Sequence, residues 1–262
     1  MDKRMLTPGE VASTIVSVNT KRAGFSTKTC ILLGILAGIF IGLGGLGNIV
    51  VSQTLGGIDP GLAKFAGGVV FPVGLMLVVI CGAELFTGNN LMTLAVMEKK
   101  ITMGQVFRNW GLVYVANFIG ALILVIVVFY SDTLAKEAAT KAISIAEAKV
   151  GLTFLQAFLK GILCNMIVVL AVWMATAGQD IISKIFACWF PIMLFVLCGF
   201  EHSVANMFFI PMGMILGAQV SIGSFISSFF AVTLGNIVGG AIIIPWMYHN
   251  SYLNVNKIKS TN

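Results

Sequence analysis

The chain has 262 residues, of which 58% are hydrophobic and 10% are charged, and its formal net charge is +6 at pH 7. Because a soluble domain carries about 25% charged residues, this composition excludes a water-soluble globular protein and predicts that membrane lipid covers much of the chain. The basic residues fall mainly in short loops and near the chain ends. This pattern is typical of a membrane orientation signal and not of a nucleic-acid-binding surface.

Residues 1–28 precede the first long apolar stretch and are predicted to form a cytoplasmic N-terminal interfacial helix. Thr7-Pro8-Gly9-Glu10 marks its start, because this is a capping-box sequence with proline at the first helical position. Residues 249–262 are predicted to form a cytoplasmic C-terminal tail.

Six apolar stretches predict an all-α integral membrane protein, since a membrane-spanning helix needs about 20 largely apolar residues. They cover residues 29–52, 63–97, 104–130, 152–176, 182–215 and 219–247. The second and fifth are too long for one span, and each contains glycine and polar residues near its middle. We therefore predict that transmembrane helices 2 and 5 are broken. The loop at 131–150, rich in Ala, Lys and Glu, predicts a short helix.

The distribution of Lys and Arg predicts a multi-pass protein of the cell membrane with both termini in the cytoplasm. Eleven basic residues then lie inside and four outside. The inner ones are Lys3, Arg4, Lys21, Arg22, Lys28, Lys99, Lys100, Arg108, Lys184, Lys257 and Lys259, and the outer ones are Lys64, Lys136, Lys141 and Lys149. Lys160 lies within the fourth span.

The two interruptions repeat one another. Residues 81–89 and 198–206 share Cys, Gly, Glu and Asn at the same offsets, and further matches occur in the same order on either side. These are Gly34-Ile35-Leu36 with Gly161-Ile162-Leu163, and Asn117 and Gly120 with Asn236 and Gly239. Each copy has three spans, an odd number, so the two copies must have opposite orientations in the membrane. We therefore predict that residues 29–248 form a channel domain of two inverted repeats, about 29–130 and 152–247. Unwound backbone at membrane depth must be buried or line a cavity, which predicts one central passage.

Ionisable residues inside a membrane are costly and usually functional. We expect Glu84 and Glu201 to accept hydrogen bonds from backbone N–H groups freed in the breaks. His202 lies in the second break and is the candidate donor of a hydrogen bond or a proton to a passing anion. Thr87 and Asn165 either donate to the solute in the same way or bond to a neighbouring helix.

At these residues the chain resembles the formate/nitrite transporter family over essentially its whole length. The segments that carry the resemblance are Gly82-Ala83-Glu84-Leu85-Phe86-Thr87-Gly88-Asn89, Gly161-Ile162-Leu163-Cys164-Asn165, Gly199-Phe200-Glu201-His202-Ser203-Val204-Ala205-Asn206-Met207 and Phe209-Ile210-Pro211-Met212-Gly213. The resemblance implies an aquaporin-like homopentamer with one pore in each subunit.

The resemblance also implies roles for individual residues. An outer hydrophobic slit would consist of Phe71 and Phe195, and an inner slit of Leu75, Leu85 and Val168 with Phe86 nearby. Between the slits His202 would face the solute, with Thr87 and Asn165 close by. Lys149 would communicate with Glu201, His202 and Asn206, and Glu84 is the repeat counterpart of Glu201.

The function expected from these features is passage of a small monovalent anion, foremost formate, through hydrophobic constrictions that exclude hydrated ions. Proton donation near His202 would neutralise the solute and lower the cost of passage. Nitrite and hydrosulfide channels of the same family remain open. A neutral-solute pore of the aquaporin kind is a further alternative, although neither break contains Asn-Pro-Ala. No metal, cofactor or enzymatic activity is expected, because the apolar runs hold no Ser/His or two-His arrangement and the cysteines lack metal-ligand spacing.

Overall fold

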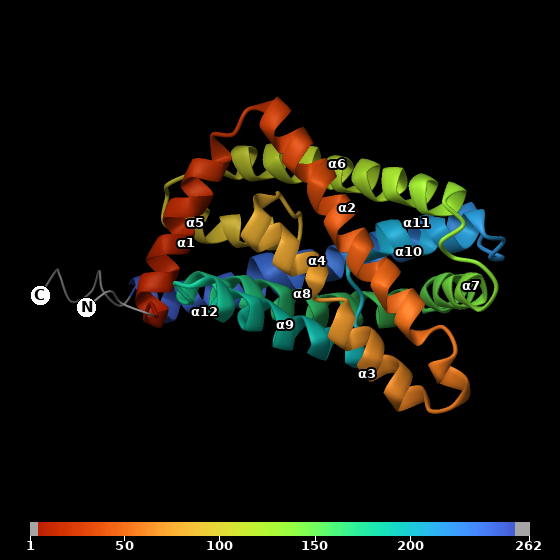
Figure 1. The fold of residues 1–262 in the computed structure, drawn as a ribbon. Helices are drawn as coiled ribbons and strands as arrows, with labels where there is room; N and C mark the ends of the chain where they lie inside the picture. The colour runs from red at the N-terminus through yellow and green to blue at the C-terminus, as the bar shows by residue number, and fades with distance from the viewer. Residues whose placement is uncertain (1–4, 255–262) are drawn as a thin grey trace, which may run out of the picture.

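The computed structural model of the chain describes residues 5–254, which form a helical bundle with one isolated β-bridge between Met5 and Gly178. The α-helices are α1 (Pro8–Ala23), α2 (Thr27–Ser52), α3 (Pro60–Val70), α4 (Val73–Met76), α5 (Met92–Met97), α6 (Met103–Tyr130), α7 (Glu137–Val150), α8 (Phe154–Ala177), α9 (Ile181–Leu197), α10 (Ser203–Ile215), α11 (Ile222–Ile237) and α12 (Ile244–Tyr248). Figure 1 shows α1 and α12 at one end of the elongated bundle and α7 at the other.

Within residues 5–254, five stretches are long and apolar enough to cross a membrane. They are Thr27–Ser52, Pro60–Gly82, Met103–Tyr130, Phe154–Ala177 and Ile222–Leu253, and two shorter apolar helices accompany them, α9 and α10. The predicted interruptions are present. The stretch Pro60–Gly82 stops being helical after a π-helical turn at Leu77–Gly82. The predicted fifth stretch, residues 182–215, is divided into α9 and α10 between Leu197 and Ser203.

The two predicted surface helices are also present, as α1 and α7. The N-terminal helix begins at Pro8, where the Thr7 backbone N–H donates to the Glu10 carboxylate over 2.8 Å. The last stretch extends further than expected, because a π-helical turn at His249–Leu253 continues it past residue 247. The rings of Tyr248 and Tyr252 pack against each other here, at 5.6 Å between centroids. Of the predicted tail, residues 255–262 lie outside the described part of the chain, as do Lys3 and Arg4 at the other end.

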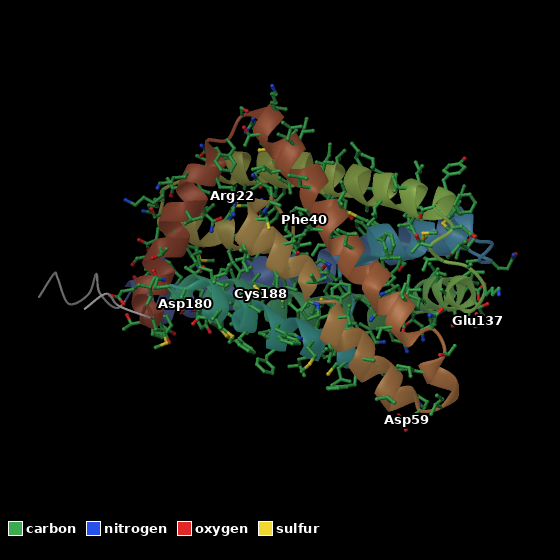
Figure 2. All side chains as sticks on the ribbon, viewed as in Figure 1. Arg22, Phe40, Asp59, Glu137, Asp180 and Cys188 are labelled. Carbon is green, nitrogen blue, oxygen red and sulfur yellow. The ribbon has the colours of Figure 1, made fainter. Side chains whose placement is uncertain are left out.

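Charged and apolar side chains are separated along the bundle. Figure 2 shows Arg22 and Asp180 toward the end that holds α1, and Asp59 and Glu137 toward the end that holds α7. Between the two ends the exposed side chains include apolar rows at helical spacing, as on α9, where every fourth residue is an exposed Ile, Phe or Leu. A surface of this kind is stable against lipid and unstable against water.

The two halves of the chain pack by the same contacts. Helix α2 packs along α6 in the first half, and α8 along α11 in the second. At both crossings glycine permits close approach of the backbones. A Cβ at Gly120 would lie 2.0 Å from the Ile35 carbonyl oxygen, and a Cβ at Gly239 would lie 2.2 Å from the Ile162 carbonyl oxygen. The surface helices correspond as well, since α1 packs on α5 and α7 on α10, each of which follows a break.

We predict that Gly120→Ala destabilises the protein by about 1–3 kcal/mol, because the added methyl group collides with backbone that has no room to move. The matched control is Gly111→Ala in the same helix, where an added Cβ meets nothing within 4 Å and the better helix former should be neutral or slightly stabilising. Thermal unfolding of both variants in detergent measures the difference. Equal unfolding temperatures would contradict the close crossing.

Candidate functional site

Both breaks begin at a glycine in a left-handed backbone conformation. Gly82 has φ +84° and Gly199 has φ +67°, values that are favourable for glycine and costly for other residues. Each glycine ends its helix in the manner of a C-terminal cap. The next residue bonds back into the helix, since Ala83 N–H donates to Val78 and Phe200 N–H donates to Phe195. From there the chain runs extended, so several backbone polar groups lose their helical partners.

In the first break the side chain of Asn117 on α6 supplies the missing partners. Its carbonyl oxygen accepts from the Phe86 backbone N–H at 3.0 Å. Its amide nitrogen donates to the backbone carbonyls of Gly34 at 2.8 Å and Glu84 at 2.9 Å. Asn117 is fully buried, so each of these bonds replaces one that water would make outside the membrane.

Asn236 on α11 does the same in the second break. Its carbonyl oxygen accepts from the Ser203 backbone N–H at 2.9 Å, and its amide nitrogen donates to the carbonyls of Gly161 at 2.8 Å and Glu201 at 3.0 Å. The expectation that the glutamate side chains accept from the freed N–H groups was therefore wrong. An amide suits the task better, because it supplies an acceptor and two donors at once.

The glutamates are instead held by side-chain donors, and each pairs with one basic residue. The Glu84 carboxylate accepts from Arg22 Nε at 2.7 Å and from Asn89 Nδ2 at 2.7 Å. The Glu84 side chain is 4% exposed and the Arg22 side chain 22% exposed. Neither carboxylate oxygen is left bare toward a passing anion.

The second glutamate has the equivalent pair of donors. Lys149 Nζ lies 2.9 Å and Asn206 Nδ2 2.8 Å from Glu201 Oε2. The family resemblance implies that Lys149 communicates with Glu201, His202 and Asn206, and the structure places Lys149 and Asn206 in contact with Glu201. The Lys149 ammonium also lies 5.3 Å from the centroid of the Phe209 ring, a cation–π distance.

Arg22 was missed by the sequence analysis, which counted it only as a cytoplasmic charge. A signal was available: Lys149 follows Arg22 by the same number of residues as Ile162 follows Ile35. The internal repeat therefore includes the surface helices as well as the spans, with α1 the counterpart of α7. Extending the alignment outside the apolar stretches identifies Arg22 as the partner of Glu84.

His202 joins the two breaks. Its ring accepts at Nδ1 from the backbone N–H of Ala205 at 3.0 Å, which makes it the N-cap of α10. Because a backbone N–H only donates, Nδ1 carries no proton, and the neutral ring carries its proton on Nε2. This nitrogen lies 2.8 Å from Thr87 Oγ1 in the first break. His202 therefore donates to Thr87, and the hydroxyl hydrogen of Thr87 has no acceptor among the described residues.

Asn165 on α8 lies beside this pair, but its side-chain amide nitrogen donates to other groups of the protein. Its amide nitrogen lies within 3.3 Å of three oxygens, which are the Thr87 carbonyl, the Asn90 side chain and the Asn236 carbonyl. Both amide hydrogens therefore have acceptors within the protein, and Asn165 links the two halves of the chain by hydrogen bonds. Its carbonyl oxygen is buried without a partner in residues 5–254.

Aromatic rings pack against one another on the Lys149 side of His202. Phe71 and Phe195 meet edge to face with ring centroids 5.6 Å apart, and Phe71 also stacks on Phe209 at 6.3 Å. Phe195 stacks on the His202 ring at 5.9 Å. Phe209 was not among the predicted constriction residues, and its neighbours make it part of the same cluster.

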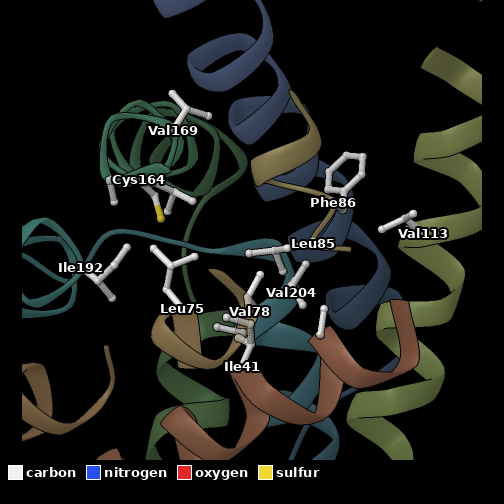
Figure 3. Packing of buried hydrophobic residues seen from close by; sticks show 14 of the residues in the cluster. Ile41, Leu75, Val78, Leu85, Phe86, Val113, Cys164, Val169, Ile192 and Val204 are labelled. Atoms are coloured by element: carbon white, nitrogen blue, oxygen red, sulfur yellow. The ribbon is translucent and has the colours of Figure 1, made fainter. Parts of the chain in front are cut away.

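The three aliphatic side chains predicted to form the inner slit are buried. Leu75, Leu85 and Val168 are at most 3% exposed. Figure 3 shows Leu85 pointing toward Leu75, while the Phe86 ring lies on the opposite side of the backbone, toward α6. There it packs on Trp110 at 5.9 Å and Tyr114 at 4.8 Å. Phe86, grouped with the inner slit in the sequence analysis, lies in the packing between the break and α6, because side chains alternate along an extended segment.

Two cavities approach the constricted region from opposite ends of the bundle. We call the one bordered by α1 the α1 cavity; it has a volume of about 350 Å³ and is lined by Arg22, Leu75, Glu84, Leu85 and Lys184 among others. The α7 cavity has a volume of about 470 Å³ and is lined by Phe71, Lys149, Phe195, Glu201, His202 and Phe209 among others. Basic groups thus stand at both approaches, apolar groups in the narrow part, and the His202–Thr87 pair between them.

The bundle, its apolar belt and its two opposed cavities define a polytopic helical membrane protein of the transport class. The chain matches the family model described as formate/nitrite transporter over residues 9–250. The chain belongs to the formate/nitrite transporter family.

Its relatives agree in sequence and in fold. A probable formate transporter of Methanothermobacter thermautotrophicus is 41% identical, with 97% of this chain and 99% of the relative aligned. A solved structure described as an FNT family ion channel matches with TM-score 0.86 and 26% identity over 92% of this chain and 98% of that one. A pentameric formate channel with formate bound matches with TM-score 0.78 and 34% identity over 87% and 98%.

We predict that Asn117→Ala and Asn236→Ala each destabilise the protein by several kcal/mol, because each leaves two buried backbone groups of its break unpaired at a cost of about 1–3 kcal/mol per group. Asn250→Ala, which removes two exposed hydrogen bonds, one to the Trp246 carbonyl and one from Asn254, is the control. Unfolding temperature and yield of folded protein in detergent report the effect. If the two breaks are equivalent, the two variants lose similar stability, and loss of stability in only one of them would contradict that equivalence.

Proposed function

We propose that the chain is a channel for small monovalent anions and that formate is its principal solute. The proposal is carried by one observation: the His202–Thr87 hydrogen bond lies between two apolar constrictions, and each cavity beyond them presents a basic side chain, Arg22 or Lys149. The names of the relatives, a probable formate transporter and a formate channel with formate bound, support formate as the solute. Nitrite and hydrosulfide are the competing solutes within the family.

We propose the following architecture for the channel. Six spans form two inverted repeats of three, with α9 and α10 together crossing the membrane as one broken helix. The matched contacts of Asn117 and Asn236 support this arrangement. Five copies assemble in the cell membrane with both termini in the cytoplasm. The description of the structural relative as pentameric and the charge distribution of the sequence support these points.

The proposed passage of an anion follows from the side chains along the route. Basic groups in the cavities concentrate the anion, while the aromatic and aliphatic constrictions exclude hydrated ions. Thr87 donates its hydroxyl hydrogen to the solute, and the bond from His202 polarises that hydroxyl and strengthens the donation. A second proton on His202 would have to break the cap of α10, so we assign His202 a hydrogen-bonding role. The proton that neutralises a weak-acid anion is then taken from water.

The experiment compares uptake of formate, nitrite and hydrosulfide into proteoliposomes, with osmotic swelling in glycerol as the test for a neutral-solute pore. We predict that the wild type takes up formate and that Thr87→Ser takes it up at the same rate within a factor of about two. In Thr87→Val the rate should fall about tenfold or more, because the variant loses a hydrogen bond to a charged group. Preference for another anion would reassign the solute, and glycerol permeation without anion uptake would refute the proposed function.

We further predict that Arg22→Gln lowers formate flux about tenfold or more, because it leaves the Glu84 carboxylate buried and unpaired beside the route, at a cost of about 3–5 kcal/mol to the pair. The double variant Arg22→Gln/Glu84→Gln removes both charges and should recover part of the flux. Lys149→Gln and Lys149→Gln/Glu201→Gln repeat the comparison in the other cavity. Normal flux in both single variants would show that the pairs have no part in conduction.

A further inference from the structure

The α7 cavity carries more positive charge than the passage of one monovalent anion requires. Four lysines from three helices line it, Lys64 on α3, Lys141 and Lys149 on α7 and Lys160 on α8, together with a single carboxylate, Glu201. Glu201 pairs with Lys149. Within residues 5–254, the other three lysines form no ion pair.

The placement of these lysines follows from the helices that carry them. Lys141, Ile145 and Lys149 stand four residues apart on α7, so they share the face that lines the cavity. Lys141 and Lys160 are half-buried and Lys64 is exposed, so the charges stand at different depths along the cavity wall. Low-dielectric walls focus the field of such a group of charges and raise the local concentration of counter-ions.

The α1 cavity differs in this respect. Arg22 pairs there with Glu84, and the Lys184 ammonium donates to the Ala175 carbonyl at 2.8 Å. Its two basic groups therefore both have partners in the protein. Among the residues that line these two cavities, the lysines without an ion pair or hydrogen bond to the protein belong to the α7 cavity, although both cavities would need to admit the same solute.

We propose that the α7 cavity is a binding site for a free multivalent oxyanion, which blocks the passage from that end. The cavity has about 470 Å³ of space, ample for a sulfate, a phosphate or a small polycarboxylate. Such an anion binds the three lysines together, whereas a monovalent anion satisfies one. It does not pass the Phe71–Phe195 constriction, because one proton leaves it charged and an unpaired charge is costly in apolar surroundings. The inference that the oxyanion blocks anion passage rests on the proposed function, whereas the inference that it binds in the α7 cavity does not.

The first experiment measures block. Formate uptake into proteoliposomes is recorded with sodium sulfate on the α7 side and with sodium chloride at matched ionic strength. We expect sulfate to inhibit more than chloride, and Lys64→Gln/Lys141→Gln to raise the half-blocking sulfate concentration roughly fivefold, as the loss of two weak ion contacts implies. The control variant Lys136→Gln removes an exposed lysine at the start of α7 that does not line the cavity. It is compared with the single variant Lys64→Gln, and it should leave the half-blocking sulfate concentration unchanged.

The second experiment measures occupancy without transport. Cys198 lines the α7 cavity and is exposed, and the other exposed cysteine, Cys81, is removed as Cys81→Ser. The rate at which neutral methyl methanethiosulfonate modifies Cys198 is measured in sulfate and in chloride of equal ionic strength. We expect sulfate to slow the modification, and Lys64→Gln/Lys141→Gln to remove the difference. Equal modification rates in the two salts would overturn the proposal, even if formate flux is normal. Slower modification in sulfate would support anion binding, even if the protein conducts no formate.

A lipid phosphate presents the same chemistry as a free oxyanion, so the second experiment is repeated in two membranes. In vesicles of phosphatidylcholine alone and of phosphatidylcholine with phosphatidylglycerol, the free-ion site predicts the same protection of Cys198 by sulfate. Protection that disappears when the anionic lipid is added would assign the cavity to a lipid headgroup and refute a site for a free ion.

Discussion

The structure depends on one constraint: backbone groups freed inside a membrane must be satisfied by the protein itself. Opening two helices at mid-depth frees N–H and C=O groups that lipid does not solvate, at a cost of several kcal/mol for each unsatisfied group. Asn117 and Asn236 meet that cost with two hydrogen bonds apiece to freed backbone groups, and a third bond ties each asparagine to a neighbouring helix. Because these bonds hold the breaks open in extended form, Thr87 from one half and His202 from the other come within 2.8 Å of each other.

The same constraint accounts for the charges. A carboxylate next to each break would oppose an anion, yet Glu84 and Glu201 each accept from one basic side chain and one asparagine. The basic partners come from α1 and α7, at opposite ends of the bundle (Figure 1). Each surface helix therefore does more than cover the bundle, since it brings a positive charge into the membrane region where a negative one would otherwise be unpaired.

Hydropathy and the internal repeat predicted five of the apolar spans, the two breaks and the surface helices, because length, periodicity and glycine positions are local properties of the sequence; the predicted fifth span is two shorter helices, α9 and α10. The partners across the fold were harder to predict. Asn117 and Asn236 were recognised as a repeated pair, but their bonds to the breaks depend on how α6 and α11 pack. The side of the break on which the Phe86 ring lies, and the ion pair between Arg22 and Glu84, are likewise set by tertiary contacts between distant segments.

The central claim is that a small anion crosses between the two breaks and accepts a hydrogen bond from Thr87. A cryo-electron microscopy map of the protein in lipid nanodiscs with saturating formate tests it most directly. The account predicts solute density within hydrogen-bonding distance of Thr87 Oγ1, between the Phe71–Phe195 pair and the Leu75–Leu85 pair. Density for formate only between subunits, with the Thr87 hydroxyl bonded to a protein carbonyl, would contradict it.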